Sequence, residues 1–171
     1  MKYRTSLIIA ALLASLFAGC SKRPAHTVLT SSASIVIEPG DSVGPVHSGM
    51  TTQQVVAELG EPDQTQNSAL EYVNLGMLVV PSKDGHVQMV LCVDSSKGEP
   101  FTNSFAGHTK EGIGIGSSRA DVIKAYGQPT ATHSMGGNSG FEELRYKSQG
   151  FMIEIKGGKV YSIAVIFKTT P

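Results

Sequence analysis

The most regular feature of the chain is a pattern of apolar and polar positions that occurs twice, 67 residues apart. Segment 49–62, GMTTQQVVAELGEP, aligns with segment 116–129, GSSRADVIKAYGQP. Both carry apolar residues at the i, i+1, i+4 spacing of a narrow helical stripe. Each segment therefore predicts one short amphipathic helix, which needs packing against another element to persist in water.

Residues at both ends of these segments have the chemistry of helix caps. A Thr-x-x-Gln sequence begins the first helix, and Ser-x-x-Asp stands at the same place in the second, as in a capping box. Each helix then ends at a glycine suited to a left-handed C-cap, with a proline two residues later. The candidate capping residues are Thr51, Gln54 and Gly60 in the first segment and Ser118, Asp121 and Gly127 in the second.

Apolar runs behind each helix predict three β-strands per segment, with Asp84-Gly85 and Gly157-Gly158 as tight hairpin turns. The expected strands are 69–73, 77–81 and 86–93, then 142–147, 151–156 and 159–167. The expected fold class is therefore α+β, with two tandem repeats over residues 35–105 and 106–171. In each repeat, short helices pack on a three- to four-stranded antiparallel sheet in two layers. Residues 132–140, THSMGGNSG, are expected to form a glycine-rich loop.

The last expected strand of each repeat is apolar on both faces. In VQMVLCV, Met89, Leu91 and Val93 alternate with Val90 and Cys92, and residues 163–166 show the same property. One face is expected to pack beneath the helices. The other face must meet either the sister repeat or a partner protein, and the sequence leaves both open.

The N-terminal residues have the features of a secretory signal peptide over residues 1–19. Lys2 and Arg4 precede an apolar run of about 20 Å, shorter than the roughly 30 Å hydrocarbon core of a bilayer. Residues 17–20, Phe-Ala-Gly-Cys, resemble the lipobox of bacterial lipoproteins. The resemblance implies a palmitate- and diacylglycerol-bearing Cys20, and Ser21 implies sorting to the outer membrane. Residues 20–34 would then be the lipidated cysteine and a flexible tether.

The repeated unit itself resembles a known family. A Gly-[Met/Ser]-[Thr/Ser] start, a Val-[Val/Ile] pair and a Gly-x-Pro end are similar to the small lipoproteins of the barrel-assembly machinery, of the SmpA/OmlA type. Two such units in tandem resemble the β-lactamase-inhibitory-protein architecture. The family pattern contains no catalytic residue, so the resemblance implies a fold and a binding role.

Charge and motifs exclude several classes of function. The chain has 14 Lys and Arg against 14 Asp and Glu, and loss of Lys2 and Arg4 leaves a mature chain near −2 with no basic cluster, so nucleic acid is not an expected partner. The glycines of EGIGIGSS, residues 111–118, lack the lysine and spacing of a phosphate loop. Hydrolase motifs are absent, and Ser139 lacks the spacing of a nucleophile elbow. We therefore predict no catalytic residue and no cofactor.

The histidines and cysteines do not have the spacing of a metal site. No C-x-x-C motif occurs, and we expect each histidine to lie on a loop or turn. With Cys20 lipidated, Cys92 has no partner for an internal disulfide, and it is interpreted as a buried small hydrophobe, with a reactive thiol as the alternative. The histidines are His26, His47, His86, His108 and His133.

A duplicated structural framework without recognisable chemistry favours a non-catalytic function. The sequence predicts a binding or scaffolding lipoprotein on the periplasmic side of the outer membrane, attached by its lipid and partnered by another envelope protein. No small-molecule substrate is evident. The alternative is an inhibitor of a secreted or periplasmic enzyme, as the resemblance to the β-lactamase-inhibitory protein implies.

Overall fold

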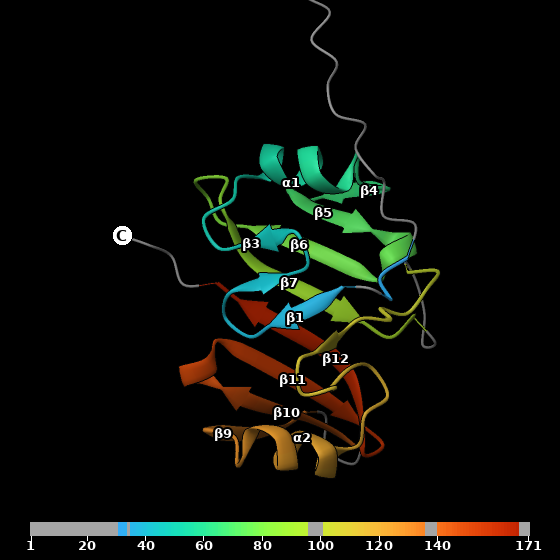
Figure 1. The fold of residues 1–171 in the computed structure, drawn as a ribbon, viewed down its shortest axis with the longest axis vertical. Coiled ribbons are helices and arrows are strands. Elements are labelled where there is room, and N and C mark those ends of the chain that lie inside the picture. The colour runs from blue at the N-terminus through green and yellow to red at the C-terminus, as the bar shows by residue number, and fades with distance from the viewer. Residues whose placement is uncertain (1–30, 34, 96–100, 136–139, 168–171) are drawn as a thin grey trace, which may run out of the picture.

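Strands dominate the computed structural model, which describes residues 31–33, 35–95, 101–135 and 140–167 (Figure 1). The large sheet has eight strands: β4 (Gln64–Gln66), β5 (Ala69–Tyr72), β6 (Met77–Pro81), β7 (Val87–Val93), β9 (Ala131–Met135), β10 (Phe141–Tyr146), β11 (Phe151–Lys156) and β12 (Lys159–Ile166). The small sheet has four: β1 (Val36–Glu38), β2 (Ser42–Val43), β3 (Val46–His47) and β8 (His108–Thr109).

The large sheet is antiparallel throughout, in the order β4-β5-β6-β7-β12-β11-β10-β9. Its centre is the pairing of β7 with β12, in which Cys92 lies opposite Ile163 and Val90 opposite Val165. Both strands are rich in β-branched and apolar residues, as expected of strands buried among others. Two 3₁₀ helices, η1 (Val73–Leu75) and η4 (Lys147–Gln149), connect β5 to β6 and β10 to β11.

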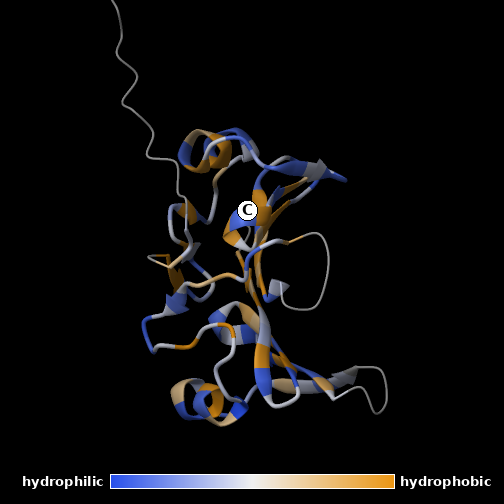
Figure 2. Ribbon diagram, turned by 90° about the vertical axis from the view of Figure 1, so that its right-hand side faces the viewer, coloured by the Kyte–Doolittle hydropathy of each residue, from blue (hydrophilic) through white to orange (hydrophobic). Residues whose placement is uncertain are grey.

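One face of the large sheet is covered by two α-helices and the small sheet. Helix α1 (Thr52–Leu59) and helix α2 (Arg119–Tyr126) lie at opposite ends of the large sheet, and β1 and β3 lie in front of its middle (Figure 1). A view turned by 90° shows that α1, α2 and the small sheet lie on the same side of the large sheet (Figure 2). Strand β1 pairs in parallel with β8, which joins two segments about 70 residues apart in the chain.

The hydrophobic core fills the space between the sheet and this cover. One row of cross-strand partners in the core comprises Tyr72, Met77, Cys92, Ile163, Ile153 and Leu144, each 0–3% exposed. Helix α1 buries Val55 and Leu59 against the core, and α2 buries Val122. The short helices are thus held by packing, since eight residues do not form a stable isolated helix.

The predicted fold class, α+β with two tandem repeats, is wrong. The protein is mostly β: among the described residues only α1 and α2 are α-helices, with eight residues each. The strands expected in two separate sheets are joined by the β7–β12 pairing into one eight-stranded sheet, and a second sheet of four strands was not predicted. The capping and stripe patterns describe local segments correctly, but they hold no information on which strand edges pair.

The six predicted strands correspond to β5, β6, β7, β10, β11 and β12 within one residue at each end. The predicted loop 132–140 is wrong at its start, because Thr132–Met135 belong to β9. Residues 136–139, with Ser139, lie outside the described residues. So do the predicted signal peptide, Cys20 and most of the predicted tether.

Candidate functional site

The face of the eight-stranded sheet opposite the helices carries a row of side chains from six adjacent strands. Cross-strand partners project from the same face of an antiparallel pair. The registers therefore define a row that runs from β5 to β10 through Glu71, Leu78, Leu91, Ala164, Met152 and Arg145. We call the side of the sheet with this row the open face. Of the described helices and strands, none covers it (Figure 2).

A second row widens the apolar part of the open face. Val80 lies opposite Met89, and Met89 lies opposite Ile166. Ile166 is 38% exposed, and all the other members of the two rows except Glu71 and Ala164 are partly exposed. The apolar stripe so formed comprises Leu78, Val80, Met89, Leu91, Met152, Ala164 and Ile166. It answers the question that the sequence left open: the two apolar strands pair edge to edge, so neither covers the other's second face.

Charged side chains border the apolar stripe on both sides. Glu71 lies at the β5 end and Arg145 at the β10 end of the row. The Nε of Arg145 donates to the carboxylate of Glu143 on the same strand. On the neighbouring row the Ser162 hydroxyl donates to Glu154, with 2.6 Å between the oxygens. An apolar centre with a polar rim is the usual anatomy of a protein–protein interface.

An aromatic pair and a lysine lie where β10, β11 and β12 reach the hairpin at residues 157–158. The rings of Phe141 and Tyr161 form an edge-to-face contact with centroids 5.5 Å apart. The ammonium of Lys156 lies 4.2 Å from the Phe141 ring centroid, which is cation–π distance. Aromatic residues are enriched among interface hot spots, so this cluster is a further candidate contact region.

The predicted capping residues form both capping boxes, away from the open face. Thr51 Oγ1 accepts from the Gln54 amide, and Gln54 Oε1 accepts from the Thr51 amide at 2.8 Å. In α2, Ser118 and Asp121 make the same reciprocal pair. The hydrogen bond from Ser118 Oγ lowers the pKa of the Asp121 carboxyl.

The C-cap glycines also have partners in the sheet. The amides of Gly60 and Gly127 donate to the carbonyls of Val56 and Ile123. Their own carbonyls accept from the hydroxyls of Tyr72 and Tyr146, at 3.0 and 3.1 Å. The two C-cap glycines therefore attach the C-terminal ends of the helices to the large sheet.

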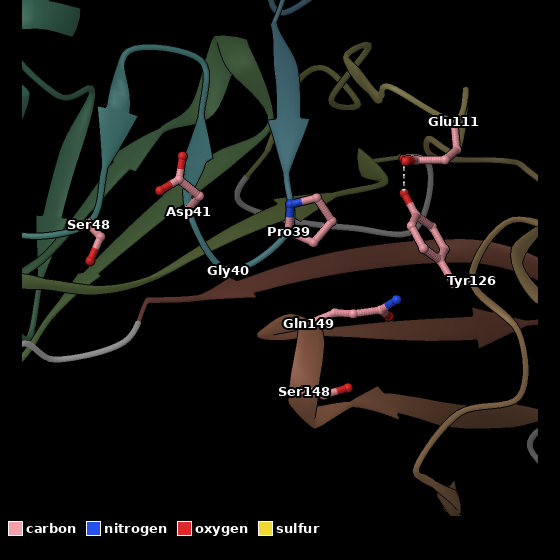
Figure 3. A pocket seen from close by; sticks show the side chains of 8 residues that line it. All are labelled: Pro39, Gly40, Asp41, Ser48, Glu111, Tyr126, Ser148 and Gln149. Atoms are coloured by element: carbon pink, nitrogen blue, oxygen red, sulfur yellow. Dashed lines mark hydrogen bonds between the residues drawn. The ribbon is translucent and has the colours of Figure 1, made fainter.

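A polar pocket of about 550 Å³ lies between the small sheet, α2 and η4 (Figure 3). It is lined by Pro39, Gly40, Asp41, Ser48, Glu111, Tyr126, Ser148 and Gln149. Figure 3 shows Tyr126 pointing toward Glu111, with Asp41 and Ser48 on the other side of the Pro39–Gly40 turn. The carboxylates of Asp41 and Glu111 therefore do not face each other as the acid and base of a hydrolytic pair would.

The Tyr126–Glu111 contact in this pocket has a structural explanation. The Tyr126 hydroxyl donates to Glu111 Oε2 at 2.6 Å. Burial, and then this hydrogen bond, raise the pKa of Tyr126, and the same bond lowers the pKa of Glu111. The tyrosine therefore stays neutral and the glutamate charged, which ties the segment before α2 to the end of that helix. The Tyr126 ring also packs edge-to-face on Phe151, with centroids 4.9 Å apart.

The structure places Cys92 in the core. Its side chain is 0% exposed on the covered face, and burial raises the pKa of the thiol. A thiol that is neither ionised nor accessible is a poor nucleophile, so Cys92 acts as a small core residue.

The histidines were expected on loops or turns, and for three of them this is wrong. His47 lies in β3, His108 in β8 and His133 in β9, while His86 bridges to Thr51 before β7. His26 lies outside the described residues. Within the described part of the chain, no three His, Cys, Asp or Glu side chains gather where they could hold one metal ion. In the same residues, no helix has the length and hydropathy needed to cross a membrane.

Sequence reasoning found part of the open face and missed the rest. The apolar character of β7 and β12 on both sides was visible in residues 87–93 and 163–166. The sequence did not identify Leu78, Val80 and Met152 as part of this surface. Each alternates with core residues, which is the pattern of an ordinary amphipathic strand. Only the register between strands shows that they join one surface.

Comparison with known proteins adds one distant structural likeness. No protein-family model matches the chain, and no curated protein matches it. A crystal structure of a DUF4309 family protein, YjgB from Bacillus subtilis, is similar over 70% of this chain and 80% of that chain, at 14% identity and a TM-score of 0.45. We therefore interpret the site from its own geometry.

Proposed function

We propose that this chain is a lipid-anchored, non-catalytic binding protein of the bacterial cell envelope, which holds another envelope protein on its open face. Lipidation of Cys20 would attach it to the outer membrane on the periplasmic side, with residues 21–34 as the tether. The lipobox-like residues 17–20 support the anchor. The apolar stripe supports the binding role.

The observation that carries the binding role is the exposure of the apolar stripe. Seven apolar residues from four adjacent strands lie together, and only Ala164 among them is buried. Soluble proteins rarely expose contiguous apolar surface of this kind unless it meets a partner. The neighbouring Arg145, Glu143 and Glu154 supply charges that would set the orientation of that partner.

A folded protein suits this surface better than an extended peptide. Strands β6, β7, β12 and β11 are all paired on both sides, so the stripe offers side chains and no free strand edge. Peptides that bind sheets usually add a strand at such an edge. A partner with its own apolar patch would bury the stripe without leaving backbone groups unpaired.

Position-dependent crosslinking in intact cells tests the proposal. A photoreactive residue at Leu91 or Met152 lies on the open face, and one at the exposed Glu58 of α1 is the matched control on the covered side. We expect the same discrete adduct from Leu91 and Met152, and none from Glu58. Equal adducts from all three positions, or no adduct from the open face, would refute the proposal. The identity of the captured protein then separates a structural partner from an enzyme that the chain inhibits.

The membrane anchor has a separate test. Changing Cys20 to Ser removes the acceptor for the lipid, so we expect the protein to move from the membrane fraction to the soluble periplasmic fraction. The serine variant carries no acyl chain at position 20, so we expect no part of the protein to remain attached through this residue. Unchanged fractionation of the variant would contradict lipid attachment at Cys20.

A further inference from the structure

A second binding feature lies at one corner of the open face, next to η4. It is a pocket of about 440 Å³, lined by Arg145, Lys147, Gly150, Phe151, Met152, Ile166 and Phe167. These residues come from the ends of β10, β11 and β12, where the strands meet the 3₁₀ turn. Its volume lies within the range of roughly 300–1,000 Å³ typical of small-molecule sites.

Most of the pocket lining is apolar. Phe151 and Phe167 are 1% and 4% exposed and belong to the hydrophobic core. Met152 is partly exposed, and Ile166 is one of the two large hydrophobic residues that are exposed in the described chain. Filling the pocket with apolar atoms would remove the Ile166 side chain from water at little cost, since no polar group of these four side chains needs solvation.

The charged members of the lining are both cations. Among the described residues, Arg145 has one ion-pair partner, Glu143, which accepts from its Nε. The terminal N–H groups of the guanidinium can therefore donate to a ligand. Lys147 is exposed, and among the described residues no carboxylate lies within ion-pairing distance of its ammonium. The two basic groups lie two residues apart at the same end of β10. An anion bound here would therefore meet the positive charge of Lys147, together with the terminal N–H groups of Arg145, whose charge Glu143 balances, beside an apolar surface.

The backbone at this corner argues against an extended peptide as the occupant. Strands β10, β11 and β12 each pair with a neighbour on both sides, and the Ile166 amide already donates to the Gly150 carbonyl at 2.8 Å. A peptide in the pocket would bury amide groups without partners, at a cost of about 1–3 kcal/mol each. An alkyl chain has no such groups to satisfy.

We propose that this pocket binds an amphiphile with an alkyl chain and an anionic head group, of the fatty-acid type. The alkyl chain lies against the partly exposed Met152 and the exposed Ile166. The head group lies between Arg145 and Lys147. This is a site for a small ligand beside the apolar stripe, and it does not depend on the protein partner proposed above.

The opposite corner of the open face lacks this chemistry. There, β5 and η1 present Glu71 and Val73 at the positions that Arg145 and Lys147 take along β10 and η4. Glu71 and Val73 are 7% and 6% exposed, so among the described residues these two positions offer no accessible cation. The proposal therefore places one amphiphile site in the described part of the chain.

Direct binding of defined amphiphiles to the full chain carrying Cys20→Ser tests the proposal. Laurate below its micellar concentration is the probe, dodecylamine is the control with the opposite charge, and the Met152 methyl NMR signal reports the position. We expect one molecule of laurate to bind per chain, with a shift of that signal, and dodecylamine to bind at least about tenfold more weakly. No laurate binding, or equal binding of dodecylamine, would overturn the proposal.

Two variants and one control locate the ligand. Lys147→Glu should weaken laurate binding about fivefold by reversing an exposed charge. Ile166→Glu should weaken it about tenfold or more, by placing a carboxylate in the apolar wall. Lys83→Glu makes the same charge change in the exposed turn before β7 and should leave binding unchanged. An equal effect of Lys83→Glu and Lys147→Glu would show non-specific attraction and reject the site, whatever the crosslinking experiment gives.

Discussion

The connections β5–η1–β6 and β10–η4–β11 have the same backbone conformation. They differ in the segments that pack against them. In both, a strand runs into a three-residue 3₁₀ helix that ends at a left-handed glycine, Gly76 with φ +66° and Gly150 with φ +72°. In both, the tyrosine that precedes the 3₁₀ helix donates to a helix C-cap carbonyl. Similar sequences have produced similar local structure.

The surroundings of the two connections differ. The chain that follows β7 returns over η1: the Phe105 amide donates to Val93 at 2.9 Å, and Asn103 Nδ2 donates to the Asn74 carbonyl at 3.2 Å. Val73 and Val93 are 6% and 9% exposed as a result. At η4, Lys147 and Ile166 stay exposed. The same backbone motif thus gives a closed corner in one place and an open pocket in the other, according to the segment that covers it.

The largest effect is expected from removing the cover of the closed corner. Phe105 is 2% exposed, so Phe105→Ala leaves a cavity in the core and should lower the free energy of unfolding by about 4 kcal/mol. Phe141→Ala is the matched control. Because Phe141 lies at the surface and is partly exposed, this substitution should cost about 1 kcal/mol. Urea denaturation measures both. Equal losses would contradict the assignment of Phe105 to the core.

The next effect comes from the close packing at Gly76. An added Cβ would lie 2.8 Å from the Asn103 carbonyl oxygen and still closer to the Phe105 amide nitrogen. Gly76→Ala should therefore cost about 3 kcal/mol, from the positive φ and the clash together. Gly112→Ala has a similar φ of +80° but nothing within 4 Å, and should cost about 1 kcal/mol. A Gly76 variant no less stable than the Gly112 variant would show that residues 103–105 can move away from the added Cβ.

The two tyrosine hydroxyls are expected to contribute equally. Tyr72→Phe and Tyr146→Phe each remove one hydrogen bond to a C-cap carbonyl and should each cost about 1 kcal/mol in thermal or urea unfolding. A loss confined to one variant would show that only one helix is held by its tyrosine.

The free energy of unfolding at alkaline pH should distinguish the Tyr72→Phe variant from the parent protein. Burial, with the nearby Glu61 and Asp63 carboxylates, raises the pKa of Tyr72 to about 12 from 10.0. Because the folded-state pKa lies above the unfolded one, this stabilisation is complete below pH 10 and is lost as the pH rises toward 12. The Tyr72→Phe variant should lose less stability than the parent over that interval. Parallel pH profiles for variant and parent would contradict this.

The smallest effects are expected at the N-caps. Thr51→Ala and Ser118→Ala each remove a side-chain acceptor for the third helical amide, at a cost of about 0.5–1 kcal/mol. Thr51→Ser keeps the acceptor and is the matched control. Thermal denaturation should rank Thr51→Ser near the parent and the two alanine variants below it. A Thr51→Ser variant as unstable as Thr51→Ala would assign the loss to packing of the methyl group.

The local elements could be predicted from the sequence because short-range chemistry fixes them. The caps around α1 and α2 and the glycine turns mark element ends within a few residues. The topology could not be predicted in this way. Strand β1 has three residues and pairs with β8 about 70 positions later, and β9 has the sequence Ala-Thr-His-Ser-Met, which lacks apolar alternation. Pairing partners of such strands depend on the whole fold.

The candidate site was predictable only in its centre. Strands β7 and β12 are apolar on both faces, and this indicated a second surface to be covered. The flanking Leu78 and Met152, and the charges of Glu71 and Arg145, join that surface through the sheet register. A one-residue shift in any pairing would have moved them away from it.

Oxidation of native methionines, in intact cells and after purification, tests the two faces of the sheet without any substitution. Met89 and Met152 lie partly exposed on the open face, and Met77 is 0% exposed in the core. Oxidation to the sulfoxide follows access of the oxidant. We expect Met89 and Met152 to oxidise rapidly in the purified protein and slowly in cells, where a partner covers them, with Met77 slow in both. Equal oxidation of Met89 and Met152 in cells and in purified protein would contradict a binding role for the open face.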